Sequence, residues 1–334
     1  MVSPKSQVSE APGLPYGDPG PNKLLPSAGT WEHFDPVRRD ETRLRPGVLR
    51  LCGHLGLGDA TVTRFPGGSL PVYAVGEDLV LKLFPPFCRE RHAVEERVLR
   101  AIEGRLPVPT PRVRESGDFQ RWGYVLMTRL RGEPLTEAWP RLTAGERDRL
   151  ATRLGTMLAA LHEVETASLS GLGPADWPEF LAGQRAGCLA RQRERGLDEV
   201  WAERIPEFLE SVPLPASAPV LLHTEVMREH LLVGDGAGRW PVSGLFDFEP
   251  AMLGAREYEF VAVGLFVAAG DAPFLRRLLL AYGYPRDTLD EGLQRRLLAY
   301  TLLHRYSDLP WYLERLPAPG VASLGALARR WWPL

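Results

Sequence analysis

Apolar positions follow two different patterns along this chain of 334 residues. Between about residues 61 and 130 the apolar runs are short and are separated by turns rich in glycine and proline, which is typical of strands. The turns at 66–69 and 76–78 join the first three runs into an antiparallel meander. The predicted strands are Thr61–Phe65, Val72–Val75, Leu79–Phe84 and Tyr124–Leu130.

Beyond Gly132 the apolar residues recur at helical spacing, as at Leu150, Leu154, Met157 and Leu161. A spacing of three and four residues predicts amphipathic helices with one buried face. Further helices are predicted over Arg89–Glu103, Pro178–Arg195, Val200–Leu209 and most of Pro273–Arg315.

One short island of strand pattern interrupts this helical half. It consists of Val220–Leu222, Leu231–Val233 and Val242–Phe248, and a glycine-rich turn at 234–238 separates the last two. This turn predicts a hairpin between its two flanking strands.

These patterns predict an α+β protein with two lobes, a β-rich one followed by a mainly helical one. Residues 1–30 are rich in Pro, Gly and Ser and predict a flexible tail. Residues 31–130 form the N-lobe, with a first helix at about Pro36–Leu57 and the small antiparallel sheet. Residues 131–334 form a mainly helical C-lobe. Strands and helices do not alternate regularly, so a Rossmann fold is not expected.

The charge balance and the cysteines narrow the classes of partner. The formal net charge is -2, so no excess of basic residues points to nucleic acid or to an anionic membrane. We see no apolar run of membrane-spanning length and no signal peptide, and we expect a cytoplasmic monomer. The cysteines at 52, 88 and 188 form no metal-binding or disulfide pattern.

The distribution of lysine singles out one candidate site. Arginine is the usual cation in this chain, and the only lysines are Lys5, Lys23 and Lys82. Lys82 stands within a predicted strand, and Glu95 lies on the following helix. A strand lysine held by a helix glutamate is the means by which kinases bind phosphates. The alternative is an edge-strand lysine beside a solvated carboxylate. Glu95 is preferred over Glu96 because it shares a helix face with Leu99 and Ile102.

A second candidate site lies in the segment 223–230 and across the predicted hairpin from it. Pairing of the two hairpin strands brings His230 close to Asp247, and Glu225 stands at the tip of the preceding loop. Two carboxylates and an imidazole therefore converge. A solvated surface loop is the alternative. A metal hydrolase built on His223, Glu225 and His230 is disfavoured because the HExxH helix pattern is missing.

The order of these motifs resembles the aminoglycoside phosphotransferase and choline-kinase superfamily, which implies a two-lobed, protein-kinase-like fold. The family pattern His-Gly-Asp, four residues, Asn, then Ile/Val-Asp-Phe is matched here by His223-Thr224-Glu225, four residues, His230, then Phe246-Asp247-Phe248. Further matches are 126–130 with the following GEPL sequence, the helix end at Leu161-His162, and 254–259. The segments 80–84 and 300–304 are similar to the hygromycin B phosphotransferases.

The resemblance implies a role for each matching residue. Lys82 would hold the nucleotide phosphates and Glu95 would position it, with the phosphate loop at Ser69. The backbone of Met127, Thr128, Arg129 and Leu130 would meet the nucleotide base. Asp247 and His230 would stand at the metal-binding positions and Glu225 at the catalytic one, braced by His223 and Glu259. The implied co-substrate is ATP or GTP with Mg²⁺ or Mn²⁺.

Two substitutions depart from the family pattern. Glutamate in place of aspartate at Glu225 moves the carboxylate by roughly an ångström, which can cost on the order of a hundredfold in rate. Histidine in place of asparagine at His230 offers nitrogen where Mg²⁺ prefers oxygen, whereas Mn²⁺ tolerates imidazole better. Two interpretations follow: an active small-molecule kinase, or a pseudokinase or binding protein with little turnover.

The acceptor implied by the resemblance is a hydroxylated small molecule, often a cationic sugar. Asp308, Trp311 and Glu314 belong to an aromatic and acidic cluster that suits such a molecule, with hygromycin B as a candidate. The alternative is a packed helix with solvated carboxylates.

Overall fold

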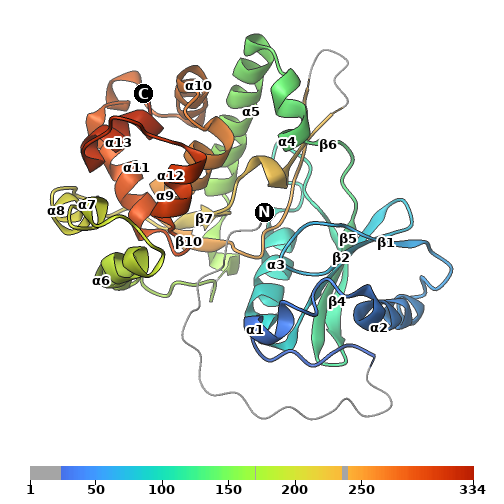
Figure 1. Ribbon diagram of the computed structural model, residues 1–334. Coiled ribbons are helices and arrows are strands. Elements are labelled where there is room, and N and C mark those ends of the chain that lie inside the picture. Colours follow the sequence, from blue (N-terminus) through green and yellow to red (C-terminus); the bar gives the residue numbers. More distant parts are fainter. Residues whose placement is uncertain (1–23, 170, 235–239) are drawn as a thin grey trace. The chain divides into compact units, whose positions relative to one another are not determined.

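The computed structural model describes residues 24–169, 171–234 and 240–334 (Figure 1). The chain divides into two compact units. Of the described residues, the first unit holds those up to Glu103 together with Pro111–Leu130, and the second holds Gly104–Thr110 and Arg131–Leu334. No helix in the described ranges has the length and apolar character needed to cross a membrane.

The first unit is built on a five-stranded antiparallel sheet in the order β1-β2-β3-β5-β4. Its strands are β1 (Val62–Arg64), β2 (Val72–Val75), β3 (Leu79–Phe84), β4 (Val113–Phe119) and β5 (Trp122–Thr128). Its helices are α1 (Trp31–Phe34), α2 (Glu41–His54), η1 (Pro86–Cys88) and α3 (Arg89–Ile102). Helix α3 packs against β3, β4 and β5.

The sequence did not reveal β4, because this strand carries mostly polar residues and lies at the sheet edge. The predicted helix Pro36–Leu57 is shorter in the structure, since α2 begins after its N-cap Asp40. The strand predicted at Tyr124–Leu130 begins and ends two residues earlier, as β5.

The predicted tail is partly wrong. Its residues 1–23 lie outside the described residues, but residues 24–30 belong to the packed unit. The amides of Leu24 and Leu25 donate to Gln120 Oε1 at 2.7 and 3.0 Å, and Trp122 Nε1 donates to the carbonyl of Pro26. Leu25 is buried, so its burial and these hydrogen bonds hold a segment whose composition alone indicated a flexible chain.

The second unit is mainly helical, as its sequence pattern predicts. Its longer helices are α5 (Ala144–His162), α6 (Trp177–Glu194), α10 (Ala272–Tyr282) and α11 (Glu291–Leu303). Helix α5 begins with a capping box of Thr143 and Glu146 and packs along α10. Gly155 permits this close approach, since a Cβ there would lie 2.3 Å from the carbonyl oxygen of Leu278.

The remaining elements of this unit are short. They are β6 (Glu133–Pro134), α4 (Leu135–Ala138), η2 (Trp139–Arg141), η3 (Thr166–Leu169), α7 (Glu199–Ala202), α8 (Ile205–Glu210), α9 (Arg256–Ala262), the π-helical η5 (Val263–Ala268), η6 (Arg286–Thr288), α12 (Leu309–Arg315) and α13 (Leu324–Trp331). The helix predicted over Val200–Leu209 is in fact two short helices, α7 and α8.

The β island forms two small sheets, β10-β7 and β6-β8-β9. Its strands are β7 (Val220–Leu222), β8 (Leu231–Val233), β9 (Val242–Leu245) and β10 (Met252–Gly254), and η4 (Arg228–His230) precedes β8. Leu231 pairs with Leu245, which confirms the predicted hairpin. The second strand ends at Leu245 rather than at Phe248, so 246–248 form a loop at its end. The predicted turn at 234–238 lies almost wholly outside the described residues.

Candidate active site

Lys82 and Glu95 form a buried ion pair within the first unit. Lys82 stands in β3, where it pairs with Val125 of β5, and Glu95 lies on the buried face of α3 with Val98, Leu99 and Ile102. The Lys82 ammonium donates a hydrogen bond to Glu95 Oε2, and the two side chains are only 7% and 2% exposed. Burial of two charges is weak evidence for stability, so the pair calls for another reason to be present.

The structure distinguishes Glu95 from its neighbour Glu96. The Glu96 carboxylate accepts hydrogen bonds from Arg100 Nε at 3.1 Å and from Ser116 Oγ at 2.9 Å. The predicted pairing of Lys82 with Glu95 is therefore confirmed, while the roles of both residues stay predictions.

The other positions predicted for the nucleotide lie within the same unit. Ser69 is in the turn between β1 and β2, beside Gly68, whose φ of 93° requires the left-handed region. The amide of Thr128 donates to the carbonyl of Arg112, and that of Arg129 donates to the carbonyl of Asp78. These two amides are thus used inside the sheet and its turn. Met127 is also paired within the sheet, with Val80 of β3 and Val113 of β4, so base contact by these backbone positions stays a prediction.

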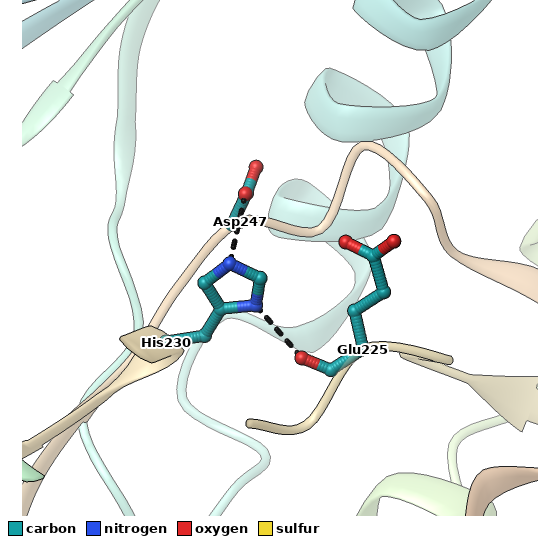
Figure 2. A group of neighbouring side chains, drawn as sticks. All are labelled: Glu225, His230 and Asp247. Carbon is teal, nitrogen blue, oxygen red and sulfur yellow. Dashed lines mark hydrogen bonds and ion pairs between the residues drawn. The ribbon is translucent and has the colours of Figure 1, made fainter. Parts of the chain in front are cut away.

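In the second unit, Glu225, His230 and Asp247 converge at one end of the β8–β9 hairpin (Figure 2). One ligand atom from each side chain lies within 4.8 Å of those of the other two, and all three side chains are half-buried. Hairpin pairing places His230 just before β8 and Asp247 just after β9. The predicted convergence is therefore confirmed.

The hydrogen bonds of His230 fix its tautomer. Its Nδ1 lies 2.7 Å from the carbonyl oxygen of Glu225, which can only accept, so Nδ1 carries a proton. Its Nε2 faces Asp247 Oδ2 at 3.3 Å. A metal cation bound here would therefore be reached by both groups.

This donor set fits a divalent cation. Two carboxylates and one imidazole nitrogen suit a metal that accepts both oxygen and nitrogen, such as Mn²⁺, better than they suit Mg²⁺, which prefers oxygen alone. His230 and Asp247 are held by backbone on either side of the hairpin, so they are placed before any ion binds.

His223 and Glu259 support the loop that carries Glu225. Glu259, on α9, accepts the amide of His223 at 2.6 Å and the amide of Thr224 at 2.9 Å. His223 Nε2 donates to the carbonyl of Phe246 at 3.0 Å, and its Nδ1 accepts the amide of Glu225 at 3.3 Å. Burial lowers the pKa of His223 to about 4, so the ring stays neutral at pH 7 and can accept at Nδ1.

Sequence reasoning missed a third support, Arg228. Its guanidinium lies 3.6 Å from the centroid of the Trp139 ring and donates twice to the carbonyl of Val267. Burial lowers the pKa of Arg228 to about 10, which still leaves it charged at pH 7. Arg228 therefore anchors the loop between Glu225 and His230. In the sequence, the sign of this supporting role was the position of Arg228 between Glu225 and His230.

The residues predicted to bind the acceptor do not form one cluster. Asp308 accepts Arg195 Nη1 at 2.6 Å and caps α12 by accepting the amide of Trp311. Its carboxylate is buried and has a structural role, and its contact with the acceptor stays a prediction. The Trp311 ring packs on Phe266, whereas Glu314 lines an open surface pocket.

Comparison with known proteins places this geometry in context. The family model for the phosphotransferase enzyme family matches residues 61–296. The GDP complex of wild-type aminoglycoside 2'-phosphotransferase-IIIa is 17% identical, with a TM-score of 0.68 over 87% of this chain and 98% of that one. No curated protein matches the chain.

Two further solved structures are similar. The apoenzyme of macrolide 2'-phosphotransferase MphH from Brachybacterium faecium is 23% identical, with a TM-score of 0.58 over 82% of this chain and 99% of that one. The streptomycin–ATP–APH(2")-IIa ternary complex is 19% identical, with a TM-score of 0.56 over 85% and 98%. At these identities the likeness shows the two-lobed, kinase-like α+β fold and nothing finer.

Proposed function

The chain belongs to the phosphotransferase enzyme family, and from this premise we propose that it transfers the γ-phosphate of ATP or GTP to a hydroxyl group of a small molecule. The observation that carries the proposal is the convergence of Glu225, His230 and Asp247 at the end of one hairpin. Phosphoryl transfer requires metal ligands and a carboxylate beside the attacking hydroxyl, and these three side chains supply both.

Each residue has a separate task in this scheme. Lys82, steadied by Glu95, neutralises charge on the nucleotide phosphates. Asp247 and His230 would hold a divalent cation, which would neutralise charge on the transferring phosphoryl group. Because both ligands are already placed by the hairpin, little rearrangement accompanies metal binding.

Glu225 orients the acceptor hydroxyl and accepts its proton. The acceptor oxygen forms a bond to the γ-phosphorus while the bond from that phosphorus to the bridging oxygen breaks. The products are a phosphate ester, the nucleoside diphosphate and one proton. The loop fixes Glu225 through its amide, which donates to the neutral His223 ring, and general base catalysis of this kind contributes about a hundredfold or more.

We propose an aminoglycoside or a related cationic sugar as the acceptor, with hygromycin B as the first candidate. The sequence resemblance and the similarity to solved aminoglycoside phosphotransferases support this class. The similarity to a macrolide phosphotransferase makes a macrolide the matched comparison. Trp311 and Glu314 stay candidates for acceptor contact, as does Asp308, which also caps α12.

A second candidate is a nucleotide-binding protein with little turnover. The departures at Glu225 and His230 favour it, since each alters a group that acts directly in the transfer. The presence of Lys82, Glu95 and Asp247 together favours the enzyme.

The test combines nucleotide binding with product formation. The protein is incubated with ATP or GTP, with Mg²⁺ or Mn²⁺, and with hygromycin B, streptomycin and a macrolide in turn, and phosphorylated acceptor is detected by mass spectrometry. We expect metal-dependent product that disappears in Asp247→Ala. Tight nucleotide binding without product for any acceptor would support the binding protein instead.

A further inference from the structure

The loops carrying Glu225 and Asp247 are joined by a pair of side chains to which the proposed function gives no role. Thr224 Oγ1 donates to the carbonyl of Pro250 at 3.0 Å. Arg305 Nη2 donates to that same carbonyl and to Thr224 Oγ1 at 3.3 Å. Thr224 precedes Glu225, and Pro250 follows Asp247 by three residues, so this contact connects the two loops directly.

The backbone at Thr224 makes its residue type informative. Its φ is 68°, in the left-handed region, where glycine is at ease and a β-branched side chain is a clear outlier. Thr224 is also fully buried. A strained conformation persists only where the surrounding contacts fix it, and such residues gather at functional sites. The Thr224 hydroxyl offers a link that glycine cannot make.

Asp247 lies between two carbonyl groups that are both held from the loop of Glu225. The carbonyl of Phe246 accepts His223 Nε2, and the carbonyl of Pro250 accepts Thr224 and Arg305. Asp247 itself has a φ of 72°. The short segment that carries the Asp247 carboxylate is therefore held by hydrogen bonds before and after Asp247.

Arg305 is itself fixed in place. It follows α11 by two residues, and its amide donates to the Tyr258 hydroxyl at 2.8 Å. Tyr258 lies on α9, one residue from Glu259, which holds the amides of His223 and Thr224. Residues of α9 and the residue two positions after α11 thus hold the same loop by hydrogen bonds.

We infer that Thr224 and Arg305 are positioning residues that set the Asp247 carboxylate relative to Glu225 and His230. This inference rests on the proposed function, in which those three side chains carry out the transfer. Loss of the link should affect the rate of transfer more than nucleotide affinity, because Lys82 and Glu95, which are proposed to hold the nucleotide phosphates, stand on β3 and α3 and not on these loops.

The experiment compares four variants with one matched control. Thr224→Gly keeps the left-handed backbone and removes the hydroxyl, whereas Thr224→Ser keeps the hydroxyl. Arg305→Met removes the guanidinium, whereas Arg305→Lys keeps a charge. The control is Arg191→Met, because Arg191 is a half-buried arginine whose guanidinium donates to the carbonyl of Leu302 near the end of α11 and not to the carbonyl of Pro250.

We expect Thr224→Gly and Arg305→Met to lower kcat about ten- to a hundredfold, with the nucleotide KM within about threefold of wild type. Thr224→Ser should stay within about threefold of the wild-type kcat, Arg305→Lys should lie between, and Arg191→Met should stay within about twofold. Wild-type kcat in both Thr224→Gly and Arg305→Met would overturn the inference.

Amide hydrogen exchange gives a second readout that needs no turnover. In Thr224→Gly and Arg305→Met, amides in 225–230 and 247–249 should exchange about tenfold faster or more, while Arg191→Met leaves them unchanged. Unchanged exchange in both loops would overturn the inference. If the wild type shows no turnover, the proposed function fails while this measurement still decides whether the link holds the loops.

Discussion

The ion pair of the first unit and the three-residue group of the second differ in how they are built. Lys82 and Glu95 stand on a strand and a helix, and both match the kinase pattern in residue type. Glu225 and Asp247 stand on loops, His230 ends the short 3₁₀ helix η4, and Thr224 and Asp247 have left-handed backbone. By the sequence resemblance, Glu225 and His230 are the two positions whose residue type departs from the family pattern. Both lie in the segment between β7 and β8, whereas Lys82 and Glu95 stand on regular elements.

The largest effect is expected at Asp247, the one of the three residues whose type matches the family pattern given by the sequence resemblance. Asp247→Asn should lower kcat on the order of a thousandfold, because it removes one anionic ligand of the metal and leaves His230 without its charged partner. Steady-state kinetics over a range of Mn²⁺ and Mg²⁺ concentrations measures the loss. Asp290→Asn, which weakens only the cap of α11, should stay near wild type. Equal losses in the two variants would remove Asp247 from the metal site.

Variants of Glu225 test whether the loop that carries it supports phosphoryl transfer with a glutamate or has lost that function. Glu225→Gln should lower kcat about a hundredfold or more with little change in nucleotide KM, since the proton acceptor is lost. Glu225→Asp should also lose on the order of a hundredfold, because the shorter side chain draws the carboxylate back by roughly an ångström. The exposed Glu229→Gln in the same loop is the control. A faster Glu225→Asp enzyme would mean that the loop has decayed.

A smaller effect on kcat/KM is expected from variants of Lys82 and Glu95 in the first unit, because β3 and α3 keep the two positions in place. Lys82→Arg should lower kcat/KM about tenfold or more, mainly through the nucleotide KM, because a planar guanidinium cannot replace a compact ammonium in a buried site. Glu95→Gln should act in the same direction, whereas Glu96→Gln should have little effect since that carboxylate pairs elsewhere. A Glu96 variant that equals the Glu95 variant would contradict the assignment.

The smallest effect concerns stability towards acid. Burial lowers the pKa of His304 to about 3, so the folded protein keeps this ring neutral where the unfolded chain binds a proton. Its contribution to stability is complete above pH 6.5 and is lost as the pH falls towards 3, by about 1 kcal/mol per pH unit below pH 6. Denaturant unfolding at several pH values measures the free energy of unfolding, which should fall less steeply with falling pH in His304→Asn than in the wild type. An equally steep fall in both proteins would show that His304 is not a cause of the loss of stability in acid.

The difference between residues on regular elements and residues on loops also explains what the sequence could predict. Strand and helix periodicity was enough to pair Lys82 with Glu95, because both residues lie on faces that a repeating pattern marks as buried. Hairpin pairing was enough to bring His230 to Asp247. The sequence gives no periodic signal for Thr224 or Arg305, whose contact joins residues 81 positions apart.

The structural role of Asp308 had a signal in the sequence that our prediction did not use. The acidic and aromatic residues around Asp308 suggested only an acceptor contact. An aspartate two residues before a proline, at the start of an apolar helical pattern, is also an N-cap signature, and Asp308 caps α12 in the structure. Composition around a residue therefore predicts its role less well than its place relative to a helix start.

The most direct test of the central claim is to follow the radiolabelled γ-phosphate of ATP and GTP in a single turnover, with nucleotide binding measured in parallel. We predict that label leaves the nucleotide and appears on an acceptor when Mn²⁺ or Mg²⁺ is present, and that Asp247→Ala binds nucleotide but keeps the label in place. Label that stays on the bound nucleotide in the wild-type protein, with every metal and acceptor tried, would contradict the account.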